Sequence, residues 1–141
     1  PGHHYEWAWL LNWSDKIHQR KKYGTLTKTL FDTGWRLGWD FNNGGVFDEV
    51  DCVNNQVSLS TKRFWPLLEL IKVLSVLPGN SHGDDLTSAL TIVLERYIQP
   101  NGIWTERFDQ NWTAIDRTMP TSSLYHMAMA ILELKERKLK N

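Results

Sequence analysis

The chain has 141 residues, enough for one domain with a sizeable core, and its 16 Lys and Arg residues are balanced by 16 Asp and Glu residues. A net charge of zero provides no basic surplus for nucleic acid or for an anionic membrane, so neither partner is expected. No apolar run approaches the roughly 20 residues that cross a bilayer. The lone Cys52 cannot form an internal disulfide, which fits a reducing, cytoplasmic setting.

The eight tryptophans carry more information than the charge. A single tryptophan is usually explained as a residue of the hydrophobic core. Several of these, however, stand beside charged residues: Trp7 follows Glu6, and Trp65 comes two residues after Arg63. Aromatic faces next to carboxylates and guanidinium groups suit a sugar pocket, because C–H faces stack on rings while hydroxyl groups need directional partners. A sugar site is therefore a candidate function.

The first predicted helix spans residues 5–19, and Pro1 and Gly2 form its entry. A second helical pattern follows at about residues 26–37. The next stretch, GVFDEVD at residues 45–51, places β-branched and aromatic residues after glycines and asparagines. That composition predicts a short strand of a β-hairpin.

The third predicted helix begins in TKRFWPLLELIKVL, at about residue 62. Ser60 or Thr61 is its expected N-cap, and Pro66 falls in the first turn, where its missing N–H costs nothing. Leucines and isoleucine surround Glu69, which predicts a helix buried on much of its circumference.

The same order of elements then repeats. A turn at residues 82–85 separates the two units, a helix is predicted at residues 86–97, and GIWTERFD at residues 102–109 matches the first hairpin segment. The last helix begins at Thr121 or Ser122, its expected N-caps. Each unit of about 60 residues thus reads helix, short hairpin, helix.

Five helices in up-and-down order place the N-terminal ends of the first, third and fifth helices on one rim. We expect these three to be inner helices and the other two to be outer helices of an α/α toroid, with a plain bundle or an open solenoid as alternatives. The rim would collect His3, His4, Glu6, Arg63, Trp65, Glu69, Tyr125 and His126.

Histidines among glutamates and tryptophans suit proton transfer to and from carbon, because imidazole titrates near neutrality and serves as acid or base. Glu6 stands three residues after His3, within one helical turn of it. For His126 the plainer interpretation is a hydrogen-bonded wall residue. Metal binding is the competing function, but the sequence lacks a His-x-x-x-His or cysteine-rich motif.

Two stretches, PGHHYEW at the start of the chain and STKRFWPLLELIKVL at its middle, resemble the PGHxxEW entry and the Trp-Pro-x-x-Glu helix of the N-acylglucosamine 2-epimerase superfamily. That superfamily includes bacterial mannose isomerases and cellobiose 2-epimerases. MPTSSLYHMAMAILEL is most similar to the mannose isomerase branch, and FNNGGVFDEVD and GIWTERFD complete the match. The resemblance spans nearly the whole chain in order.

The resemblance implies an all-α fold that is part of an (α/α)6 barrel, with residues 1–141 expected to be the C-terminal part of a single barrel domain. Such a part would expose inner helix faces, so we expect a homo-oligomer or a missing N-terminal half to cover them. The small-molecule substrate would be a sugar. The sequence shows no phosphate-binding glycine loop, which favours an unphosphorylated one.

The chemistry implied by the resemblance is sugar isomerisation or 2-epimerisation through an enediol, without a metal or another cofactor. His3 and His126 would be the catalytic acid/base pair, with Glu6 orienting or assisting His3. Proton return to C1 gives a ketose, and return to the other face of C2 gives the epimer. The residues expected to bind the sugar are Arg63, Trp65, Glu69 and Tyr125.

Two other functions stay open. An α/α-toroid glycoside hydrolase or lyase would need a pair of carboxylates, for which Glu49 and Glu106 are the best candidates. A sugar-binding remnant without catalysis is the third. Replacement of His126 would abolish turnover in a sugar isomerase or 2-epimerase and leave binding intact in a remnant that only binds sugar.

Overall fold

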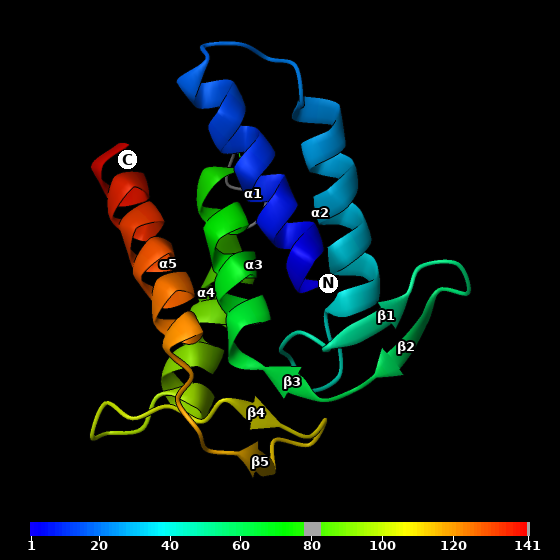
Figure 1. Cartoon of the computed structure of the whole chain (residues 1–141), viewed down its shortest axis with the longest axis vertical. Coiled ribbons are helices and arrows are strands. Elements are labelled where there is room, and N and C mark those ends of the chain that lie inside the picture. The colour runs from blue at the N-terminus through cyan, green and yellow to red at the C-terminus, as the bar shows by residue number, and fades with distance from the viewer. Residues whose placement is uncertain (78–82, 141) are drawn as a thin grey trace.

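The computed structural model describes residues 1–77 and 83–140 (Figure 1). The helices are α1 Gly2–Ile17, α2 Gly24–Gly38, α3 Phe64–Val76, α4 Gly83–Ile92, the π-helical turn Val93–Tyr97 and α5 Thr121–Lys140. The strands are β1 Glu49–Asp51, β2 Gln56–Leu59, β3 Lys62–Arg63, β4 Arg107–Phe108 and β5 Ala114–Asp116. Among the described helices, none combines the length and apolar character needed to cross a membrane.

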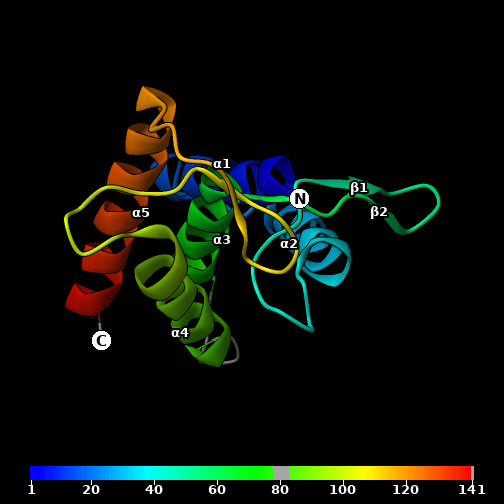
Figure 2. The same cartoon turned by 90° about the horizontal axis from the view of Figure 1, so that it is seen from below.

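The helices alternate in direction, and all the strands gather at one end of them (Figure 1). α1, α3 and α5 begin at that end, whereas α2 and α4 run back toward it. α3 packs between α1 and α5, while α2 lies against α1 and α4 against α3 (Figure 2). The predicted arrangement, with the starts of the odd-numbered helices on one rim, is therefore confirmed.

The core is centred on α3, which is apolar around most of its circumference and is covered by neighbouring helices. Leu67, Leu70 and Leu74 are fully buried, and so is Glu69. The predicted burial of this helix is confirmed. α1 approaches α2 closely at Gly34, where an added Cβ atom would lie 2.8 Å from the ring of Tyr5.

The strands form two small sheets. β1 and β2 make an antiparallel hairpin, and β3, β4 and β5 form a three-stranded antiparallel sheet in that order. Because β3 belongs to the first helix–hairpin–helix unit and β4 to the second, this sheet joins the two units at the rim. Lys62 of β3 reinforces the junction, since its buried ammonium group donates to Asp40 at 2.8 Å and to the carbonyl oxygens of Gly44 and Gln110.

The start of α3 differs from the prediction. Ser60 and Thr61 are not its N-cap, because the chain first forms β3 and the helix begins at Phe64 after Arg63. Pairing of Lys62 and Arg63 with β4 uses the backbone that a longer helix would need. The Thr61 hydroxyl instead donates to Asp48 at 2.5 Å.

Other helices also begin or end at residues that differ from the predicted ones. α1 begins at Gly2, three residues before the predicted start, and both Thr121 and Ser122 are already helical in α5. The predicted helix at residues 86–97 begins earlier, at Gly83, and ends in the π-helical turn. Of the turn predicted at residues 82–85, His82 lies outside the described residues.

Candidate functional site

Three helices bring the two predicted catalytic histidines to one tryptophan. The rings of His3, on α1, and Trp65, on α3, have centroids 5.1 Å apart. The rings of Trp65 and His126, on α5, have centroids 5.4 Å apart. Residues from the two ends of the sequence therefore meet at the rim, because α3 packs between α1 and α5.

Trp65 can reach His3 because α1 presents a glycine at this point. The indole packs directly on Gly2, where a Cβ atom would clash with the ring. From the sequence, Gly2 is predicted only to form the entry to the helix. The requirement for a residue without a side chain there follows from the packing of α1 on α3.

Glu69 holds the ring of His126. Its Oε1 lies 2.5 Å from Nδ1 of the imidazole, and its side chain is fully buried while that of His126 is 16% exposed. A hydrogen bond from Nδ1 to the carboxylate sets the tautomer and orientation of the ring, so Nε2 is the nitrogen that can accept or deliver a proton. Glu69 thus lies behind the ring of His126.

Lys72, which no sequence motif singles out, joins Glu69 and His126, and these three residues form the proton-transfer layer. Nζ of Lys72 lies 2.7 Å from Oε2 of Glu69, and both side chains are fully buried. The same ammonium group lies 4.0 Å from the ring centroid of Trp9, whose indole N–H donates to Glu133 at 2.9 Å. The available signal was a lone cation in the apolar run LLELIKVL, one helical turn after Glu69.

Arg63 is fixed at the edge of Trp65 by Asp48. Its backbone N–H and its Nε both donate to Oδ1 of Asp48, at 3.0 and 2.9 Å. The guanidinium carbon lies 5.7 Å from the ring centroid of Trp65. A positive group with fixed orientation therefore borders the aromatic surface. Asp48, in the segment GVFDEVD, is a further residue that the sequence analysis did not place at the site.

The remaining predicted residues are placed as follows. Tyr125 contacts the ring of His126 edge-on, with centroids 5.2 Å apart, and is half exposed. His4 does not join His3 at Trp65: its Nε2 faces the thiol of Cys52 at 3.8 Å, and burial, ahead of neighbouring positive charge, lowers the pKa of His4. Within the described part of the chain, Glu6 makes no hydrogen bond or ion pair, and it lies within one helical turn of His3 on α1.

The two carboxylates considered for glycoside hydrolysis lie in different surroundings. Glu49 is exposed on β1, whereas Glu106 is buried and accepts hydrogen bonds from Ser123 at 2.8 Å and Trp104 at 3.3 Å. Burial raises the pKa of Glu106, and these two hydrogen bonds oppose the rise. Its contacts give Glu106 a structural role at the start of α5.

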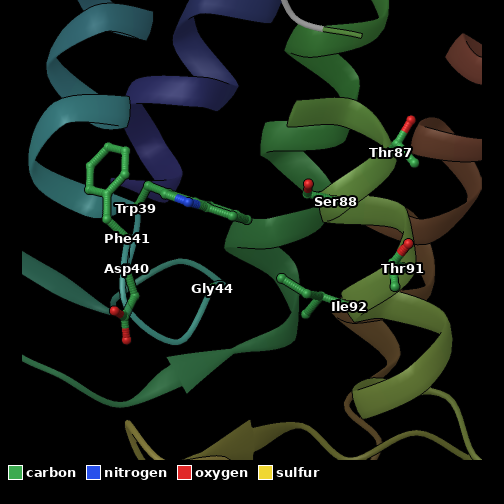
Figure 3. Close-up of a pocket in the computed structure, with 8 residues that line it drawn as sticks. All are labelled: Trp39, Asp40, Phe41, Gly44, Thr87, Ser88, Thr91 and Ile92. Atoms are coloured by element: carbon green, nitrogen blue, oxygen red, sulfur yellow. The ribbon is translucent and has the colours of Figure 1, made fainter. Parts of the chain in front are cut away.

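A hollow of 410 Å³ lies away from these residues, between the end of α2 with its following loop and α4 (Figure 3). Its lining includes Trp39, Phe41 and Ile92 and the hydroxyl groups of Thr87, Ser88 and Thr91, and no residue of the predicted rim. Across residues 1–77 and 83–140, no group of three or more His, Cys, Asp or Glu side chains is placed to hold a metal ion.

The model of the N-acylglucosamine 2-epimerase (GlcNAc 2-epimerase) family matches residues 1–130. The chain belongs to this family. A mannose-6-phosphate isomerase from Rhizobium meliloti (strain 1021) is 27% identical to the chain over 149 residues, an alignment that covers 96% of the chain and 37% of that relative. The family that the sequence motifs resemble is thus confirmed.

Two crystal structures of sugar enzymes share the fold. A D-mannose isomerase superposes with a TM-score of 0.85 at 24% identity, over 96% of this chain and 36% of that one. A sugar epimerase from a ruminal bacterium superposes with a TM-score of 0.78 at 16% identity, over 93% of this chain and 37% of that one. This member of the N-acylglucosamine 2-epimerase family is therefore part of an α/α toroid, as predicted. The chain spans little more than a third of the length of these relatives.

Proposed function

We propose that this chain carries the proton-transfer site of a sugar isomerase or 2-epimerase, with His3 and His126 as its acid/base pair. Family membership supports the reaction class. The observation that carries the assignment of residues is the His126–Glu69 contact of 2.5 Å beside Trp65, which also contacts His3. A buried carboxylate behind an imidazole is the usual way to prepare a histidine for general acid/base work.

The reaction begins with the open-chain form of an aldose. One imidazole removes the proton from C2, the electron pair of that C–H bond forms a C1–C2 double bond, and the carbonyl oxygen at C1 takes up a proton to give the enediol. In isomerisation, C1 receives a proton while the hydroxyl group on C2 loses one, which yields the ketose. In epimerisation, C2 receives a proton on its other face while the hydroxyl group on C1 loses one, and the aldehyde is restored.

The neighbouring side chains would bind the sugar around this pair. Trp65 and the half-exposed Tyr125 offer ring faces for the C–H groups, and Arg63, held by Asp48, offers hydrogen-bond donors to hydroxyl oxygens. Glu69 is fully buried and engaged by His126, so we assign it to orienting that ring in place of sugar contact. Glu6 is assigned to assist His3 once sugar is bound.

The substrate is proposed to be an aldose of the mannose type, since the relatives are named for D-mannose and mannose 6-phosphate. Proton NMR in D₂O tests the proposal with mannose, mannose 6-phosphate and N-acetylmannosamine as separate substrates. We expect the C2 proton signal to fade with one of them as deuterium replaces it.

Histidine variants assign the exchange to the site. His126→Ala and His3→Ala are expected to lower the exchange rate at least about 100-fold, the usual contribution of a general acid or base. His18→Ala is the matched control, because His18 is exposed at the end of α1 and its ring is hydrogen-bonded to the carbonyl oxygen of Ser14. Absence of exchange with every sugar, or exchange that survives in His126→Ala, would contradict the proposal.

A further inference from the structure

We infer that Lys72 is a positioning residue for His126, acting through the carboxylate that the two share. The inference rests on the proposed function of His126 and adds a third member to its proton-transfer layer. Lys72, Glu69 and His126 form a continuous series in which Nζ contacts Oε2 at 2.7 Å and Oε1 contacts Nδ1 at 2.5 Å.

The ammonium group of Lys72 contacts Glu69 and two aromatic rings beside it. Among the described residues, Glu69 is the single carboxylate within ion-pair distance of its ammonium group. Two aromatic rings also lie near the ammonium group, with the ring centroid of Trp9 at 4.0 Å and that of Tyr125 at 5.7 Å. Because the side chain of Lys72 is fully buried, no water-exposed position is left for its charge.

Lys62, the other lysine that is buried among the described residues, serves as a comparison. Lys62 donates to Asp40 and to two backbone carbonyl oxygens, and so fastens two loops together. Lys72 fastens no loop. A buried ion pair adds little stability over apolar residues of the same volume, since removing the charges from water offsets their attraction. A structural role therefore accounts for Lys62, whereas the charge of Lys72 is explained by the carboxylate it engages.

The charge of Lys72 changes what the Glu69 carboxylate does to His126. An isolated buried carboxylate would retain a proton on the neighbouring imidazole, because only the imidazolium would offset its charge. The ammonium group of Lys72 already offsets that charge, so the carboxylate does not depend on an imidazolium for charge balance. The other ionisable or charged groups around this layer are Glu133, which accepts from Trp9, Tyr125 beside His126, and His3 and Arg63 at Trp65.

The protonation of His126 can be followed directly by NMR of ring-labelled histidine, with the His126 signals assigned from the His126→Ala variant. In Lys72→Met we expect the titration midpoint of the His126–Glu69 pair to rise by about one pH unit, the size of shift that one nearby charge produces. Lys72→Arg retains the charge and should restore the midpoint. Lys16→Met is the control, since it removes an exposed pair between α1 and α5 and leaves Glu69 untouched.

A measurement on the unchanged chain guards against variants that do not fold. If Lys72 and His126 share Glu69, the Cε and Nζ signals of Lys72 will shift with the midpoint of the His126 titration. The inference would be overturned if the Lys72 signals do not shift during the His126 titration. It would also be overturned if the His126 titration curve of Lys72→Met superimposes on that of the unchanged chain. No sugar is present in these titrations, so they decide the role of Lys72 separately from the D₂O exchange that tests the reaction itself.

Discussion

Glu106 carries a carboxylate in surroundings that disfavour its charge. It is 6% exposed, and burial raises its pKa above the ordinary 4.5 despite the hydrogen bonds from Ser123 and Trp104. A carboxyl group whose pKa is higher in the folded state holds its proton more tightly there. Its contribution to stability is therefore largest while both states are protonated, and it falls once the unfolded state ionises. Its contribution to stability therefore declines as the pH rises from 4.5 through the folded-state pKa.

Replacing Glu106 by Gln should remove this decline, because an amide oxygen can accept both hydrogen bonds without becoming charged. We expect Glu106→Gln to be more stable than the original chain at pH 7, and the difference to shrink below pH 4.5. Urea unfolding at a series of pH values measures this difference in the free energy of unfolding. Glu49→Gln, on exposed β1, is the matched control, and an equal pH-dependent gain there would contradict the explanation.

At the scale of elements, the contact of α1 with α2 depends on a missing side chain. A Cβ atom on Gly34 would lie 2.8 Å from Cε1 of Tyr5 and 3.1 Å from Cβ of His4, and Tyr5 is fully buried and has no room to withdraw. Gly34→Ala should therefore lower the free energy of unfolding by about 1–3 kcal/mol through overpacking, less the gain in helix propensity.

Gly24 provides the matched control for this substitution. It begins the same helix, but nothing lies within 4 Å of an added Cβ atom. Gly24→Ala should leave stability unchanged or raise it by up to about 1 kcal/mol. Denaturant unfolding of both variants separates packing from propensity, and equal effects at the two positions would contradict the proposed contact.

The helices could be predicted from the sequence because their apolar periodicity and the repeat of the units are local properties. The start of α3 could not. Ser60 and Thr61 have the side chains of an N-cap, but the neighbouring Lys62 and Arg63 pair with β4, which lies more than forty residues later in the chain. A contact over that separation leaves no trace in the pattern around residue 60.

The same distinction holds for the candidate site. Placing His3, Trp65 and His126 on one rim followed from the alternating helix directions, and the structure brings their rings into contact. The sequence did not indicate that Lys72 would face Glu69, or that Asp48 would hold Arg63, since these pairings depend on side-chain geometry. The catalytic and binding roles of His3, Trp65 and His126 stay predictions.

At the scale of the whole molecule, α1 and α5 each expose several large apolar side chains. Leu124 and Ile131 of α5 are 50% and 57% exposed and lie seven residues apart, on one face of the helix. On α1, Trp7 is 55% exposed and Trp13 is 45% exposed. α5 packs against α3 through its opposite side, where Ala130 and Glu133 are buried.

We propose that a second copy of the chain covers the exposed face of α5, because exposed apolar surface that can pair with its like is removed from water on association. Sedimentation velocity over a range of protein concentrations should show a dimer or larger species. Introducing charge with Leu124→Glu and Ile131→Glu should shift the chain toward monomer, since the charges would be buried in the contact. Leu26→Glu changes a similarly exposed leucine on α2 and should leave association intact. A chain that sediments as a monomer at every concentration would contradict the proposal, and equal dissociation by Leu26→Glu would place the contact on another face.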